Sequence, residues 1–351
     1  MKAVVVGGGY AGVHAANRLA RLVPTAEITL VNPRPHFVER VRLHQRVAGT
    51  AAAAAPLREV LRPGITALVA AVDKIGDGVA VLDDGARVDF DHAFLAVGST
   101  VEPMPGTVPV GTWEGAERAR AALAALPAGA SVTVIGGGPT GIETASEVAQ
   151  ARPDLRVRLV GSPIAGPFGP GARARVLAGL ERLGVDLVED TAIAVDDAVR
   201  LGSGRAFSSH LTLWAVIGHV PDLAARSGLA VDPDGRVVVD EHLRSVSDPR
   251  VFAVGDCAAV PGSRFSCQTA VPQAATAVDN LVRLLEGRTP RPHVVRYVGL
   301  AVALGRRDAV VQLNHRDDRP RRARLAGRAA AAVKEIACRG AKWGASKGIG
   351  G

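Results

Sequence analysis

A glycine-rich turn that joins a strand to a helix occurs twice in this sequence and restricts the fold more than any other feature. The first copy lies in residues 2–31, where an apolar strand leads through Gly7-Gly8-Gly9-Tyr10-Ala11-Gly12 into a helical pattern and a second strand. Gly7 permits the tight turn, Gly9 lets the backbone approach a pyrophosphate, and Gly12 lets the helix pack closely on the strand. The unit predicts a dinucleotide at the helix N-terminus, and the alternative is a plain strand-to-helix turn.

The second copy lies in residues 131–160, with the same glycines at Gly136, Gly138 and Gly141. Two complete units in one chain make a chance match improbable. A protein that binds two dinucleotides most economically passes a hydride between them, so one should be a flavin and the other a nicotinamide. We term residues 7–12 the first cradle and residues 136–141 the second cradle.

The segment between the cradles contains three β-rich runs, Ile65–Val72, Val79–Leu82 and Arg87–Phe90, broken by Asp-Gly turns. This pattern predicts a β-meander that returns to the first domain. An apolar strand then ends at Gly98-Ser99, and a much later one ends at Gly255-Asp256.

Length and composition exclude several classes of protein. The 351 residues predict two or three domains. The three cysteines lack metal-ligand or CxxC spacing, which argues against a zinc site and favours a reducing compartment. The start of the chain has no signal-peptide pattern and no spanning helix is expected, so we expect a cytoplasmic protein. Aromatic residues make up only 3% of the chain, too few for the stacking platforms of a nucleic-acid-binding protein.

The ordered set of both cradles, Ala96-Val97-Gly98-Ser99 and Gly255-Asp256 resembles the two-dinucleotide flavoproteins, and most of all the type II NADH dehydrogenases and NAD(P)H:quinone reductases. The resemblance implies an α/β fold with two Rossmann-like domains, the NAD(P)H domain being inserted into a discontinuous FAD domain. The implied boundaries are residues 1–103 and 226–283 for the FAD domain, 104–225 for the NAD(P)H domain and 284–351 for a C-terminal region with a basic tail.

The same resemblance implies that FAD binds at the first cradle and NADH or NADPH at the second. Beyond the cradles it implies cofactor contacts at Asn32, Val72, Gly98, Gly255 and Asp256. The aspartate is expected to bond the ribityl and phosphate region of the flavin.

Three catalytic candidates follow from the resemblance. Glu143 would lie at the nicotinamide end of its helix close to the flavin, although a carboxylate in a first helical turn is also a common dipole partner. Gln268 and Gln273 open a later helix and would donate to an acceptor carbonyl or a flavin oxygen. An ordinary polar first turn is the alternative for both glutamines.

The acid that usually binds the ribose hydroxyls is replaced by Asn32 in the first unit and by Gly161 in the second. Asn32 can still hydrogen-bond a ribose. Without a carboxylate at Gly161 nothing repels a 2′-phosphate, and Arg173 and Arg175 follow nearby. We therefore expect NADPH to be accepted at least as well as NADH.

The net charge of +8 is concentrated at the end of the chain, where residues 316–351 hold ten Lys and Arg but three acids. A helix is expected over residues 328–343, with Val333, Ile336 and Trp343 near one face. Resemblance implies peripheral membrane contact through this tail, and packing on its own domain is the alternative. Residues 344–351 have too little apolar content to pack and are expected to be disordered.

These observations predict an FAD-dependent oxidoreductase that passes hydride from NAD(P)H to FAD and then electrons to a quinone or similar small acceptor. A soluble reductase for a ferredoxin-like protein and a redox sensor with little turnover are the alternatives. Sulfur chemistry through Cys257 and Cys267, as in sulfide:quinone reductases, is a third. A homodimer is a further hypothesis.

Overall fold

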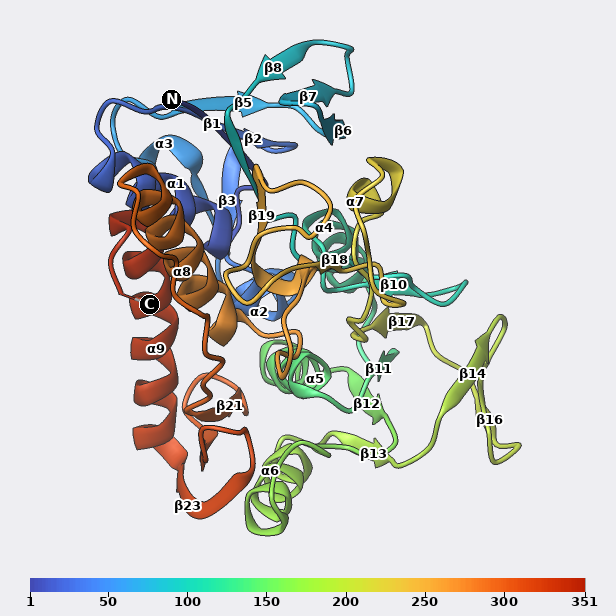
Figure 1. The fold of residues 1–351 in the computed structure, drawn as a ribbon. Coiled ribbons are helices and arrows are strands. Elements are labelled where there is room, and N and C mark those ends of the chain that lie inside the picture. Colours follow the sequence, from blue (N-terminus) through green and yellow to red (C-terminus); the bar gives the residue numbers. More distant parts are fainter. Residues whose placement is uncertain (351) are drawn as a thin grey trace.

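A computed structural model describes residues 1–350 and contains two five-stranded parallel sheets (Figure 1). The first sheet has the strand order β19-β9-β1-β2-β5, with β1 (Lys2–Val6), β2 (Glu27–Asn32), β5 (Thr66–Val69), β9 (His92–Leu95) and β19 (Val251–Ala253). Its central strands are almost continuously apolar because both faces of the sheet are covered. The edge strand β19 comes from far along the chain and pairs Val251 with Ala93.

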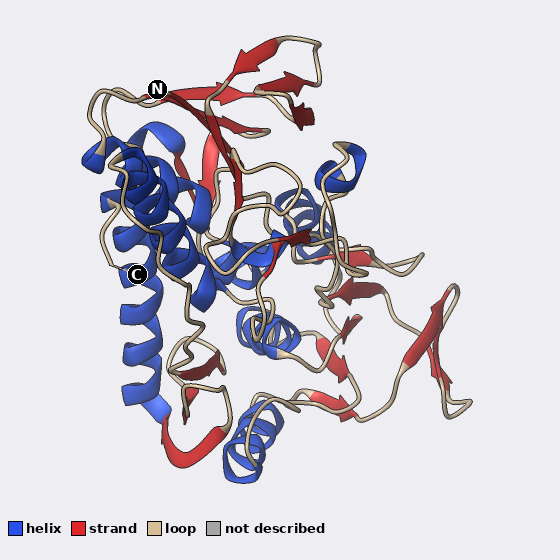
Figure 2. Ribbon diagram, viewed as in Figure 1, coloured by secondary structure: helices blue, strands red, loops and turns tan. Residues whose placement is uncertain are grey.

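Helices cover one side of this sheet, and an antiparallel meander joins the same core. The helices are α1 (Tyr10–Leu22), α3 (Leu57–Val60), α8 (Cys267–Leu285) and α9 (Gly327–Lys347), and Figure 2 shows α1, α8 and α9 grouped together. The meander consists of β6 (Val72–Gly76), β7 (Val79–Leu82) and β8 (Arg87–Asp89).

The structure corrects the predicted first strand of the meander. The run Ile65–Val72 is divided, because its first part forms β5 and pairs in parallel with β2, while Val72 begins β6. Alternating hydrophobicity indicates a strand but not its partner, so the sequence pattern merged an edge strand of the parallel sheet with a strand of the meander.

The second sheet has the order β10-β17-β11-β12-β13 and a core of its own. Its strands are β10 (Val108–Pro109), β11 (Ser131–Ile135), β12 (Arg156–Val160), β13 (Asp186–Val188) and β17 (Leu211–Trp214). The helices α4 (Trp113–Ala125), α5 (Pro139–Ala151) and α6 (Pro170–Arg182) accompany it, and β14 (Ala192–Val195), β15 (Val199–Leu201) and β16 (Ala206–Phe207) form a separate small sheet. The fold class is the predicted one, whereas the domain boundaries stay predictions.

The C-terminal region forms an antiparallel sheet of β21 (Gly299–Ala303), β22 (Ala309–Asn314) and β23 (Pro320–Ala326), followed by α9. The remaining short elements are β3 (His36–Val38), η1 (Arg40–Arg42), α2 (Leu43–Val47), β4 (Ala54–Pro56), α7 (Leu223–Arg226), β18 (Val237–Val238), η2 (Gly255–Cys257) and β20 (Ala258–Ala259).

The predicted disorder of residues 344–351 is wrong for the part of this segment that the structure describes. Helix α9 continues to Lys347, and Gly344 and Ala345 are buried. Packing here depends on small residues, not on large apolar ones: a Cβ added at Gly348 would lie 2.4 Å from the backbone nitrogen of Arg18 on α1. Close approach of two helices thus replaces the apolar side chains that the prediction required.

The two faces of α9 fit the two hypotheses about the tail, packing on its own domain and contact with a membrane. One side of the helix packs on α1, while Val333, Ile336 and Trp343 are exposed. Within residues 1–350 no helix has the length and apolar character needed to cross a bilayer. Peripheral membrane contact stays a prediction.

The contact between α9 and α1 can be tested at Asn17, which is fully buried. Its amide nitrogen donates to the carbonyls of Val60 at 2.7 Å and Ala345 at 3.0 Å, and its amide oxygen accepts from the Arg62 nitrogen at 2.8 Å. Asn17→Ala should lower the free energy of unfolding by about 1–3 kcal/mol because these groups lose a partner. Chemical denaturation of the flavin-loaded protein measures this.

The control is Lys74→Ala at an exposed position, which should change the free energy of unfolding by less than ~0.5 kcal/mol. Equal unfolding free energies for the two variants would show that the hydrogen bonds of Asn17 do not stabilise the fold.

Candidate functional site

The first cradle divides its glycines into packed and open positions. Gly7 has φ +107°, and a Cβ there would lie 2.4 Å from the Ala96 carbonyl oxygen. A Cβ at Gly12 would lie 1.9 Å from the Gly7 carbonyl oxygen. A Cβ at Gly9 would meet no atom within 4 Å. Two glycines are therefore required by the fold, while Gly9 faces the open space that a pyrophosphate needs.

The second cradle repeats this division. Gly136 has φ +131° and would place a Cβ 3.0 Å from Ala215, and a Cβ at Gly141 would lie 1.8 Å from the Gly136 carbonyl oxygen. Gly138, like Gly9, has nothing within 4 Å. The duplicated geometry fits two dinucleotides.

The residues at the two expected ribose-binding positions, Asn32 and Gly161, have different surroundings. In the first unit the Asn32 side-chain oxygen accepts a hydrogen bond from the Gly8 nitrogen at 2.8 Å. In the second, a Cβ at Gly161 would lie 2.4 Å from the Gly137 nitrogen. The second cradle therefore presses directly on Gly161, and a carboxylate cannot stand there without moving the turn.

The two arginines expected near a 2′-phosphate have different surroundings. Arg175 pairs with Asp308 at 2.6 Å, on the C-terminal sheet. Arg173 pairs with Glu189 and donates to the Ile164 carbonyl at 2.9 Å. Glu189 also accepts from the Ile164 nitrogen at 3.0 Å. Because Ile164 packs against Gly137, only Arg173 lies close to the second cradle.

Asp256 organises the polar end of the first domain. Its carboxylate accepts from the Ser266 nitrogen at 3.0 Å and from the Ser99 hydroxyl at 2.6 Å. Ser266 is the N-cap of α8, so this contact fixes the start of that helix. Arg40 donates to the carbonyl and hydroxyl of Ser99 at 2.9 and 3.0 Å. Burial lowers the pKa of Arg40, and Asp256 opposes that shift.

Sequence reasoning missed Arg40, because it lies in an irregular segment without a motif. The predicted contact between Asp256 and the flavin stays a prediction. Of the other predicted cofactor contacts, Gly98 and Gly255 both have positive φ, at +68° and +80°, and Val72 is a buried core residue at the start of β6.

The two glutamines of α8 have protein partners. Gln273 is fully buried, accepts from the Gly255 nitrogen at 2.6 Å and donates to the Ser263 hydroxyl at 3.2 Å. Gln268 accepts from the Val298 nitrogen at 2.9 Å. Both amides therefore hold neighbouring backbone in place, and their predicted contact with an acceptor has no support in this geometry.

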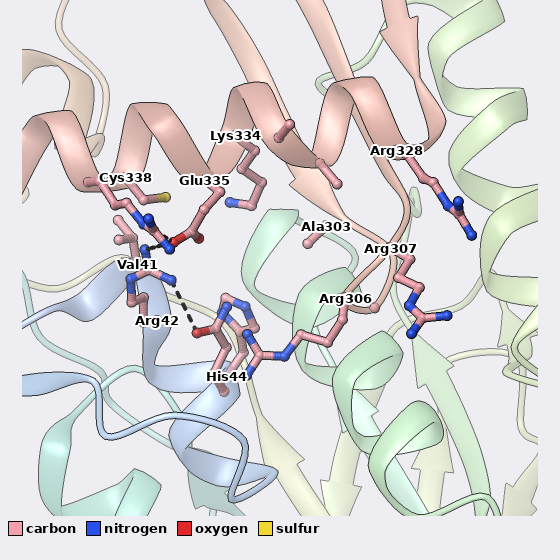
Figure 3. Close-up of a pocket in the computed structure, with 15 residues that line it drawn as sticks. Val41, Arg42, His44, Ala303, Arg306, Arg307, Arg328, Lys334, Glu335 and Cys338 are labelled. Carbon is pink, nitrogen blue, oxygen red and sulfur yellow. Dashed lines mark hydrogen bonds and ion pairs between the residues drawn. The ribbon is translucent and has the colours of Figure 1, made fainter.

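Glu143 lies at the meeting point of four elements. This buried carboxylate of α5 contacts Lys334 of α9 at 2.8 Å, the Ala303 nitrogen of β21 at 2.8 Å and His44 of α2 at 3.5 Å. Lys334 and His44 project toward each other from α9 and α2 in Figure 3. The charge of Glu143 is therefore balanced by a lysine, and the dipole of its own helix is not its main partner.

Burial and ion pairing act in opposite directions on this cluster. Burial raises the pKa of Glu143, but the Lys334 ammonium and the hydrogen bond from the Ala303 nitrogen outweigh it, so the pKa lies below its usual value. Burial lowers the pKa of Lys334, but Glu143 outweighs it, so that pKa lies above its usual value. The pKa of His44 is lowered, first by burial. At neutral pH the cluster therefore holds one ionised pair and a neutral histidine.

This chain is similar in sequence and in structure to known proteins. An NADH dehydrogenase-like protein of Mycobacterium tuberculosis is 33% identical over 322 residues, covering 80% of each chain. A type II NADH:quinone oxidoreductase of the same species is 27% identical, covering 82% of this chain and 74% of its own. The structure of NDH2 from Plasmodium falciparum in complex with NADH superposes with a TM-score of 0.80 at 16% identity, covering 99% and 96% of the two chains.

The family described as pyridine nucleotide-disulphide oxidoreductase matches residues 1–280, which is most of the chain. The predicted resemblance, the fold class and the FAD and NAD(P)H cofactors are thereby confirmed at the level of the family. This chain belongs to the pyridine nucleotide-disulphide oxidoreductases.

Proposed function

We propose that this protein is an FAD-dependent NAD(P)H:acceptor oxidoreductase whose acceptor is a quinone or a similar small molecule. The observation that carries the proposal is the duplicated cradle, in which Gly9 and Gly138 alone leave open space. The names of the M. tuberculosis relatives support the reaction class. In this proposal the first cradle holds FAD and the second holds NAD(P)H.

Bound FAD would supply the two-electron chemistry, accepting hydride from NAD(P)H and passing electrons to the acceptor. The protein's own task is to bind and orient. The N-termini of α1 and α5 would present backbone N–H groups to the two pyrophosphates. Asp256, held by Ser99 and Ser266, fixes a carboxylate at the start of α8 for the flavin's polar chain.

Glu143 and Lys334 are the charged groups that we propose to act near the reacting rings. The pair ties α5, which begins at the second cradle, to α9, which packs on the helix of the first cradle. It therefore connects the two nucleotide units through one buried contact. Its role is to keep a fixed charge arrangement and to position the helix that carries the nicotinamide site.

Anaerobic titration of the purified yellow protein tests the function. NADH or NADPH should bleach the flavin absorbance, and a naphthoquinone added afterwards should restore it. Gly9→Ala should yield a folded protein without flavin, because the added methyl group occupies only the pyrophosphate space. Gly138→Ala should retain flavin but lose bleaching by either nucleotide.

Both alanines are compatible with the backbone, since Gly9 and Gly138 have φ of −85° and −80°. Gly12→Ala serves as the contrasting variant and should fail to fold, because its Cβ would meet the Gly7 carbonyl. Full flavin content in Gly9→Ala, or normal bleaching in Gly138→Ala, would refute the assignment of the cradles.

The Glu143–Lys334 pair predicts a pH-dependent stability. Glu143→Gln leaves the buried Lys334 ammonium without its partner, which should cost about 3–5 kcal/mol when the lysine is charged. Burial then lowers the pKa of Lys334, so the variant should be less stable at pH 6 than at pH 9. The wild type should be nearly constant over this range, because its carboxylate pKa is lowered and its ammonium pKa is raised.

Denaturation curves at both pH values measure this effect, and Glu143→Gln/Lys334→Met is the matched control because it removes both charges. The double variant should recover most of the stability and lose the pH dependence. If the pair also has a functional role, NAD(P)H should reduce the flavin of the double variant more slowly than that of the wild type in stopped-flow experiments. Wild-type reduction rates in the double variant would mean that the pair is only structural.

Arg173 should govern the choice of nucleotide. Arg173→Ala is expected to lower kcat/KM for NADPH about tenfold or more, the equivalent of one charge-assisted hydrogen bond, with little change for NADH. Glu189→Gln frees this arginine and should shift the ratio toward NADPH. Arg175→Ala is the control, since Asp308 holds that side chain elsewhere. Parallel changes for both nucleotides in Arg173→Ala would contradict the assignment.

A further inference from the structure

A cavity of about 450 Å³ opens between α2, the turn from β21 to β22, and the face of α9 that is turned toward the protein (Figure 3). This volume lies within the ~300–1,000 Å³ typical of small-molecule sites. Lys334 and His44 belong to its wall, and both contact Glu143. The cavity therefore reaches the buried charge cluster described above.

The charged part of the wall is strongly cationic. It contains one acid, Glu335, and six Lys or Arg residues: Arg42, Arg306, Arg307, Arg328, Lys334 and Arg339. An unbalanced cluster of this kind around a concave surface favours an anionic ligand.

Four of these six cations already have partners. Arg42 and Arg339 share Glu335, while Arg306 pairs with Glu147 and Lys334 with Glu143. Within residues 1–350, Arg307 and Arg328 form no ion pair. Figure 3 shows these two side chains on the same side of the cavity, one from the β21–β22 turn and one from the start of α9. They are the two cations free to bind an anion.

Besides its charged groups and the side chains of His44, Gln45 and Cys338, the wall carries small apolar residues. Val41, Ala303, Ala331 and Ala332 line the cavity between its cationic groups. Alanine side chains leave room for a flat ring, and their surface favours an apolar body. The wall thus suits a molecule with an apolar ring system and one anionic substituent.

The second cradle does not account for this cavity. Arg306 of the wall pairs with Glu147, and its backbone nitrogen donates to the side-chain oxygen of Gln150 at 2.7 Å. This part of the wall therefore lies against the section of α5 that follows Glu143. The second cradle lies at the opposite, N-terminal end of α5. The pyrophosphate of a bound nucleotide would therefore lie at the other end of the helix, away from the free arginines.

We propose that this cavity admits the electron acceptor, and that the acceptor is a small aromatic quinone carrying an anionic group. This inference rests on the proposed function. The anionic group binds Arg307 and Arg328, and the ring lies along the alanine-lined wall toward Lys334. In the overall reaction the hydride of NAD(P)H and one proton from solvent convert the quinone to the hydroquinone, while NAD(P)H is oxidised to NAD(P)⁺.

The test compares 1,4-naphthoquinone with its 2-sulfonate as acceptors for the flavin-loaded protein. Arg307→Ala/Arg328→Ala should raise KM for the sulfonate about tenfold or more and change KM for the neutral quinone less than about twofold. The matched control is Arg321→Ala/Arg322→Ala on the exposed strand β23, which removes the same charge outside the cavity. It should leave both KM values within about twofold of the wild type.

A binding experiment separates failure of this inference from failure of the proposed function. If NAD(P)H does not bleach the flavin, the function fails, but calorimetric titration with redox-inert naphthalene-2-sulfonate still probes the cavity. The sulfonate should bind the wild type and the β23 control, and bind the Arg307/Arg328 variant about fivefold or more weakly. Equal affinity for all three proteins would overturn the inference.

An anionic lipid headgroup could also bind Arg307 and Arg328. Binding to phosphatidylglycerol vesicles tests this alternative. Loss of vesicle binding in Arg307→Ala/Arg328→Ala, with an unchanged KM for the sulfonate, would mean that these arginines serve a membrane surface and would overturn the assignment. Unchanged vesicle binding with a raised KM for the sulfonate supports it.

Discussion

The buried ion pair between Glu143 and Lys334 is the contact on which the arrangement of the two nucleotide units depends. Glu143 belongs to the helix that starts at the second cradle, and Lys334 belongs to α9, whose last turns pack on the helix of the first cradle. Both groups are largely removed from water, so each needs the other to remain charged. Helix α9 is thereby fixed at one end by Asn17 and near its middle by Glu143, and it runs past both units (Figure 1).

Close backbone approach replaces side-chain packing at several tight contacts. Only 3% of the residues are aromatic, and aliphatic side chains fill most of the cores, while glycines let helices and turns come into direct contact at particular points. Gly12 and Gly141 do this within the cradles, and Gly348 does it between α9 and α1. Such contacts leave no room for an added carbon atom, so these positions accept only glycine.

The sequence was sufficient for the cradles and the order of the motifs, because each depends on residues close together in the chain. It was not sufficient for Arg40, His44 or Lys334, which meet their partners only through tertiary packing and have no local spacing to mark them. Gly161 shows a different limit. Its identity indicated a missing ribose ligand, whereas the structure explains it by steric contact with Gly137. A missing functional residue and a packing requirement look the same in one sequence.

The positive charge at the end of the chain also has a different meaning once its partners are known. Lys334 and Lys342 reach Glu143 and Glu39, and so hold α9 against the protein. Arg321 and Arg322 stand on the fully exposed strand β23, while Arg328 faces the cavity. One basic segment therefore supplies structural ion pairs, a cationic outer strand and a binding wall. Net charge over a segment cannot separate these roles, because it counts cations without regard to the acids that the fold brings to them.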